Sequence, residues 1–100
     1  EIQEAVAVLK NDPREMSSNY KTRQSRIQEA KARNTPKTIA RLIRDLRARK
    51  RAKGMLNGNE RSAFNSLKQR LTEEWAIVAG VKTKQVEATL NNLLKIPQVN

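Results

Sequence analysis

Five segments of the chain carry hydrophobic residues at the three- and four-residue spacing with which a helix buries one face. The first segment, residues 2–9, stops at an Asn-Asp-Pro sequence that does not continue a helix. The second begins with Ser17 or Ser18 as its N-cap and runs to about Arg33. Its hydrophobic face is thin and its other positions are mostly basic or amide side chains. We therefore expect most of this helix to face water or a binding partner.

The third segment has the clearest boundaries. Thr35 is a suitable N-cap because Pro36 follows it, and proline is favoured at the first helical position. The hydrophobic stripe after this start predicts a helix that ends at Gly54. The stripe consists of Ile39, Leu42, Ile43 and Leu46.

Two further helices complete the predicted fold. Asn57 and Glu60 have the spacing of a capping box, and Gly80 ends the helix that they begin. The stripe of this helix is Phe64, Leu67, Leu71, Trp75 and Val78. The last helix starts near Thr83, and its stripe is Val86, Leu90, Leu93 and Leu94. Because no segment alternates as a strand does, the sequence predicts an all-α, compact bundle of about five short helices, a single domain over residues 1–100.

The composition removes most catalytic chemistry. The chain has no Cys and no His, so thiolate metal sites and the commonest general base are excluded. Glu73 and Glu74 are adjacent on a helix and point about 100° apart, so they do not converge on one substrate atom. We expect no enzyme activity, no metal site and no cofactor. No hydrophobic run approaches the roughly 18 residues of a membrane span, so a cytoplasmic protein is expected.

Positive charge is concentrated in one third of the chain. Residues 21–53 hold thirteen Lys and Arg against Glu29 and Asp45, which accounts for the whole net charge of +11. A surface this basic favours a polyanion as partner, with nucleic acid first, over a merely solvated face. The densest run consists of Arg47, Arg49, Lys50, Arg51 and Lys53.

Residues 37–53 also have the form of a basic amphipathic helix, which suits an anionic membrane or the groove of an acidic partner. The hydrophobic stripe distinguishes these possibilities, because side chains buried in a folded domain cannot also enter lipid. Four further patterned helices favour burial and argue against a membrane partner.

The three aromatic residues have different surroundings. Phe64 and Trp75 lie on a hydrophobic stripe, so we expect them in the core. Tyr20 instead opens the second helix between Asn19 and Lys21, where little hydrophobic sequence surrounds it. Its ring either packs back on the bundle or stacks on bases while neighbouring cations hold phosphates. The composition does not choose between these two uses.

Four short motifs carry a family resemblance. Asn19-Tyr20 opens a basic helix, and residues 42–46 read Leu-Ile-Arg-Asp-Leu. Leu56-Asn57 with Glu60 precedes the next helix, and Glu74-Trp75-Ala76 is followed by Gly80. In this order and spacing, over nearly the whole chain, they resemble the C-terminal helical domain of the CarD/CdnL family of bacterial RNA polymerase-binding transcription regulators. The family usually has Trp at the position of Tyr20.

The resemblance implies a DNA-binding domain that acts at promoters and stabilises the open complex from the upstream edge of the melted region. It implies that Tyr20 serves as a wedge in the minor groove, with Lys21, Arg23 and Arg26 beside it as contacts to the DNA backbone. In the family a separate N-terminal domain binds RNA polymerase. The chain therefore resembles the C-terminal part of a longer protein, a monomer of the bacterial cytoplasm associated with the nucleoid.

Two alternatives of other kinds stay open. The same basic surface suits an RNA-binding helical module, and competition between duplex DNA and structured RNA distinguishes the two. It also suits a protein-interaction domain that docks an acidic partner, which negligible binding to nucleic acid at low salt would favour.

Overall fold

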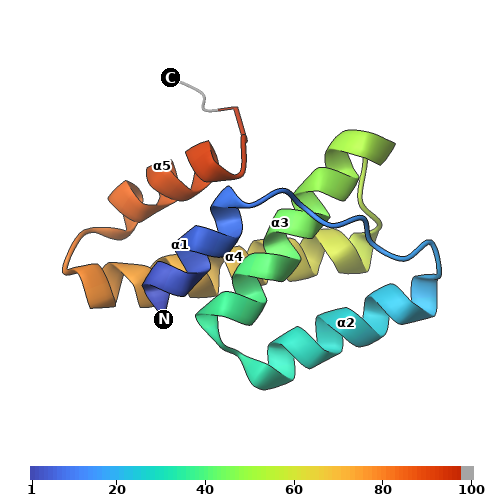
Figure 1. Cartoon of the computed structure of the whole chain (residues 1–100), viewed down its shortest axis with the longest axis horizontal. Coiled ribbons are helices and arrows are strands. Elements are labelled where there is room, and N and C mark those ends of the chain that lie inside the picture. Colours follow the sequence, from blue (N-terminus) through green and yellow to red (C-terminus); the bar gives the residue numbers. More distant parts are fainter. Residues whose placement is uncertain (98–100) are drawn as a thin grey trace.

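The computed structural model describes residues 1–97, and within that range the chain forms five helices and no strand (Figure 1). The helices are α1 (Ile2–Lys10), α2 (Tyr20–Arg33), α3 (Pro36–Lys53), α4 (Gly58–Ala79) and α5 (Thr83–Leu93). The predicted all-α bundle is confirmed.

Local capping explains where α3 and α4 begin. The Thr35 hydroxyl accepts a hydrogen bond from the Thr38 amide at 3.3 Å, and Pro36 is the first helical residue. The capping box of α4 is complete, because Asn57 Oδ1 accepts from the Glu60 amide while Glu60 Oε1 accepts from the Asn57 amide. These satisfy backbone donors that a helix start leaves unpaired.

The predicted cap of α2 is wrong by one or two residues. Asn19 is the N-cap, and its side chain accepts from the Thr22 amide at 3.2 Å. The Ser17 hydroxyl accepts from the Asn19 amide instead, so it supports the residue before the helix. The chain stays non-helical through Ser18 because residues 11–19 cross the surface of α3 before α2 can begin.

Helix α3 is the centre of the bundle, since α1, α2 and α4 all pack against it (Figure 1). Its stripe of Ile39, Leu42, Ile43 and Leu46 is fully buried, as predicted. A face enclosed by three helices cannot also enter a lipid surface. None of the described helices is long and hydrophobic enough to cross a membrane.

Residues 11–19, named here the crossing segment, link α1 to α2 and pass over α3 (Figure 1). The segment is held at two points. The Arg14 amide donates to Asp45 Oδ1 on α3 at 2.9 Å, and the Met16 side chain is buried in the core. These two attachments hold the crossing segment against the bundle, and so they fix the position at which α2 begins.

The stripe predicted for α4 is right except at its end. Leu67 and Leu71 are buried, and Phe64 and Trp75 are half-buried against the core. Val78 is 63% exposed. In the last turns the buried position is Ala76, which lies on nearly the opposite side of the helix from Val78 at about 100° per residue. The buried side of α4 therefore changes along its length, and α5 packs against this helix.

Candidate nucleic-acid interface

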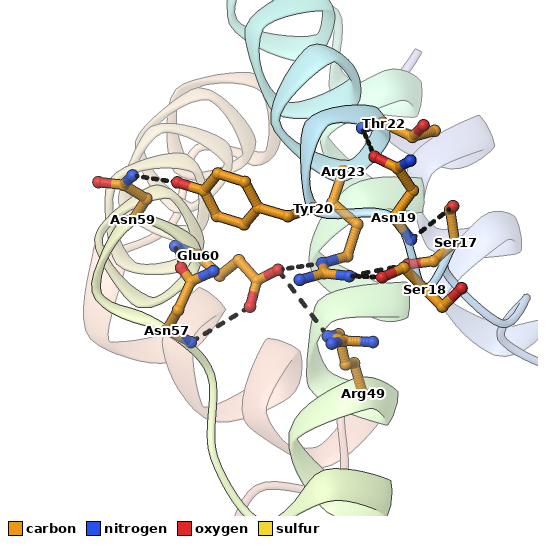
Figure 2. A network of polar contacts seen from close by, with 10 residues as sticks. All are labelled: Ser17, Ser18, Asn19, Tyr20, Thr22, Arg23, Arg49, Asn57, Asn59 and Glu60. Carbon is orange, nitrogen blue, oxygen red and sulfur yellow. Dashed lines mark hydrogen bonds and ion pairs between the residues drawn. The ribbon is translucent and has the colours of Figure 1, made fainter.

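Tyr20 is the first residue of α2 and is 48% exposed. Figure 2 shows the phenol reaching toward α4, where Asn59 Nδ2 donates a hydrogen bond to its hydroxyl at 3.0 Å. The guanidinium carbon of Arg23 lies 5.9 Å from the ring centroid, within the roughly 6 Å of a cation–π contact. The ring neither packs into the core nor projects without support.

Arg23 lies beneath this ring and is only 7% exposed. Its Nε donates to Glu60 Oε2 at 2.6 Å, and its Nη1 donates to the carbonyl oxygens of Ser17 and Ser18, both at 3.0 Å (Figure 2). Such charge-assisted bonds are stronger than neutral ones. The guanidinium therefore joins α2 to α4 and the crossing segment, and this inward geometry does not offer it to an external phosphate.

Glu60 is the acceptor at the centre of this network and is almost fully buried. One carboxylate oxygen accepts from the Asn57 amide, and the other accepts from Arg23. Arg49 Nε on α3 lies 3.8 Å from the second oxygen. Because a buried carboxylate is costly unless it is paired, these contacts make Glu60 the point where α2, α3 and α4 are held together.

Arg26 belongs to a second buried cluster. Its Nη2 donates to Asp45 Oδ2 at 2.7 Å, while Asp45 Oδ1 also accepts from Arg44 Nε and from the Arg14 amide. The Arg26 side chain remains 36% exposed, so it is not enclosed as Arg23 is. Arg26 thus joins α2 to α3 and is partly accessible from the surface.

The predicted basic run at the end of α3 is divided between two sides of the helix. Lys53 and Arg49 line a groove with Ser17 and Ser18, next to the start of α2. Arg51 and Arg47 instead line a groove with the residues that end α5. Positions two apart on a helix point about 200° apart, which explains the division. The sequence-predicted patch is therefore two patches.

Arg47 is occupied by the protein itself. It donates to the carbonyl oxygens of Leu94 at 3.3 Å and Lys95 at 3.0 Å. Burial and, secondarily, the nearby charge of Arg51 lower the pKa of the Arg47 guanidinium. By contrast Lys21, Lys50, Arg51 and Lys53 are exposed and make no ion pair within residues 1–97.

The comparisons agree with this arrangement of motifs. The family model described as CarD, C-terminal domain, matches residues 4–91. The chain belongs to this family. No significant match is found among curated proteins or among solved structures. Membership of the CarD C-terminal domain family points to a role in transcription, as the resemblance of the motifs predicted.

In this CarD C-terminal domain, one residue of the site has no signal in the sequence. Asn59 contacts Tyr20 across 39 positions of sequence, and no local pattern indicates such a pair. Glu60 was predicted as a capping residue, whereas its bond to Arg23 was not. Nothing in the described range suggests a metal centre, because no three acidic side chains there lie close enough to hold an ion.

Proposed function

We propose that this domain binds promoter DNA near the upstream edge of the melted region and helps to stabilise the open complex of bacterial RNA polymerase. It does so through the DNA backbone and the minor groove. The observation that carries the proposal is an exposed, supported aromatic ring at a helix start beside exposed cations, in a member of the CarD C-terminal domain family. RNA polymerase is contacted by a separate domain, as the resemblance to the CarD/CdnL family implies.

Tyr20 is the wedge in this proposal. An exposed ring can enter the minor groove and stack where base pairs end, provided that the protein backbone that carries it stays in place. The Arg23–Glu60 ion pair and the α4 capping box support the helix start that carries the ring. The N-terminal ends of α2 and α4 also meet there, and the positive ends of their dipoles favour nearby phosphates.

The exposed cations beside Tyr20 supply the backbone contacts. Lys21 follows the ring in sequence, and Lys53 lines the groove that adjoins Ser17 and Ser18. Lys50 is exposed near the same end of α3, and the Arg26 side chain is partly exposed. Arg51 is exposed on the other side of α3, toward the end of α5, so any phosphate contact that it makes is separate from this group. Three other arginines mainly contact groups of the protein itself and stabilise the packing beneath this surface: Arg23, Arg47 and Arg49.

Fluorescence anisotropy of a labelled promoter fork and of the matching paired duplex, over several salt concentrations, tests the proposal. We expect tighter binding to the fork. If about five phosphates are neutralised, log K falls with log salt at a slope of roughly −4 to −5. Tyr20→Ala should lower the preference for the fork with little change on plain duplex. An equal loss of affinity for the fork and for the duplex would contradict the role of Tyr20 as a wedge.

Lys53→Ala should weaken both DNAs equally and reduce the salt slope by about one. Lys84→Ala is the matched control, since Lys84 is exposed in α5, whose start lies at the opposite end of the molecule from Tyr20. Stronger competition by structured RNA than by duplex would replace DNA with RNA as the partner. Absence of binding to either at low salt would assign the surface to an acidic protein.

A further inference from the structure

Two consecutive residues of α4 hold the start of α2. Asn59 donates to the Tyr20 hydroxyl at 3.0 Å, and Glu60 pairs with Arg23 at 2.6 Å (Figure 2). The Arg23 guanidinium lies 5.9 Å from the ring centroid, and Asn59 lies at the hydroxyl end of the ring. The orientation of the ring is therefore set by the first turn of α4 as well as by its own helix.

We propose that Asn59 is a positioning residue for Tyr20, which holds the phenol ring in the orientation that meets a DNA fork. This inference rests on the proposed function and adds a specificity-determining residue to it. The Tyr hydroxyl is the acceptor of this hydrogen bond, and the Trp usual in the CarD/CdnL family has no such acceptor.

The physical reason is the freedom of an exposed ring. A half-exposed Tyr turns about two side-chain bonds, and ordering it on the DNA lowers the affinity. Fixing a side chain before binding removes that loss, which for one side chain corresponds to roughly two- to tenfold in affinity. The hydroxyl gives Tyr a polar handle that a hydrogen-bond donor can hold.

The turn that carries Asn59 is itself held by hydrogen bonds. Asn59 lies in the first turn of α4, between Asn57 and Glu60, whose capping box pairs both ends of that turn. The buried carboxylate of Glu60 adds a second attachment, through Arg23 to the crossing segment. A hydrogen bond from this turn therefore fixes the ring relative to the whole bundle.

The test is a double-mutant cycle between Asn59→Ala and Tyr20→Phe, measured as the ratio of fork to duplex affinity by anisotropy. We expect each single variant to lower this ratio by roughly two- to tenfold. The double variant should lower it no further, since both changes remove the same bond. Asn65→Ala, an exposed asparagine farther along α4, is the matched control and should leave the ratio unchanged. Independent, multiplying effects of the two changes would overturn the inference.

A second arm uses the free protein. In ¹H–¹⁵N spectra the side-chain amide resonances of Asn59 should shift in Tyr20→Phe and stay unchanged in Lys21→Ala. In a Tyr20→Trp background, Asn59→Ala should have no effect on the fork ratio. An effect of the wild-type size in that background contradicts a role through the hydroxyl.

The outcomes separate the two proposals. If Tyr20→Ala lowers the fork ratio and Asn59→Ala does not, only the role of Asn59 is lost. If Tyr20→Ala leaves the ratio unchanged, the wedge and the positioning role are both wrong. Circular dichroism of each variant confirms that the helices are intact before binding is compared.

Discussion

Asp45 and Glu60 are two buried carboxylates in a strongly basic chain, and they are used differently. Each is almost inaccessible to water and each accepts from arginine side chains. The arginine of Glu60 is buried with it, whereas Arg26 at Asp45 remains partly in water. Asp45 attaches the crossing segment and α2 to α3, while Glu60 joins three helices directly beneath the exposed ring.

The difference shows that the positive charges of the chain have two separate uses. Some guanidinium groups are bound by internal carboxylates or carbonyl oxygens, and they shape the bundle. Others remain exposed and give the surface its positive electrostatic potential. Net charge alone does not separate the two groups. The two carboxylates do, because each one identifies arginines that serve the fold.

Glu60→Gln should have the largest effect on stability. The amide keeps an acceptor for the Asn57 amide but leaves the buried Arg23 without its counter-charge, which costs about 3–5 kcal/mol. Urea unfolding followed by circular dichroism measures the change. Glu74→Gln, on the exposed part of α4, is the matched control and should stay within about 0.5 kcal/mol of the wild type. Similar losses in both variants would contradict a special role for Glu60.

Asp45→Ala should cost less, about 2 kcal/mol, because Arg26 can turn its guanidinium into water and the nearly buried Arg44 keeps its hydrogen bond to the Val8 carbonyl oxygen. The effect should be local as well. Hydrogen exchange of the Arg14 amide, which donates to Asp45, should accelerate by more than the loss of global stability explains. In Glu60→Gln the exchange of that amide should accelerate only as much as the loss of global stability explains. Equal acceleration in the two variants would mean that the clusters form one unit.

Asn57→Ala removes a single cap and should lower the free energy of unfolding by about 1 kcal/mol. Thr35→Ala removes the corresponding cap of α3 and should cost about the same. The two differ in function, because Asn57 lies in the turn that holds Tyr20. Only Asn57→Ala should reduce the preference for forked DNA in the anisotropy assay. A reduction in both would indicate that general loosening causes it.

Arg49→Ala should have the smallest effect on stability, about 0–1 kcal/mol in urea unfolding. The Arg49 Nε lies 3.8 Å from Glu60 Oε2, which is a weak contact, and the variant keeps the 2.6 Å contact between Arg23 Nε and the same oxygen. A loss as large as that of Glu60→Gln would show that the carboxylate needs both arginines.

Most of the fold was predictable because its signals are local. The caps at Thr35 and Asn57 act over three residues, and the buried stripe of α3 follows helical spacing. The predictions were wrong where the packing of distant segments changed the local pattern. Ser17 and Ser18 lie in a segment that crosses α3, so Asn19 caps α2 instead. Val78 fits the stripe of α4, but the buried side of that helix changes toward its end.

The candidate site was predictable only in part. The sequence indicated an aromatic residue among cations at the start of α2, and the structure shows how that residue is held. It did not indicate which arginines turn inward, because Arg23 and Glu60 are 37 positions apart and Arg26 and Asp45 are 19 apart. It also gave no sign of Asn59.

By itself, then, the sequence determined the five helices, their order, the central buried stripe and the excess of positive charge, since each depends on neighbouring residues or on composition. The tertiary structure decided which cations are exposed and what holds Tyr20. The physical reason is that a buried charge without a partner is strongly destabilising, and partners far apart in sequence meet only when helices pack.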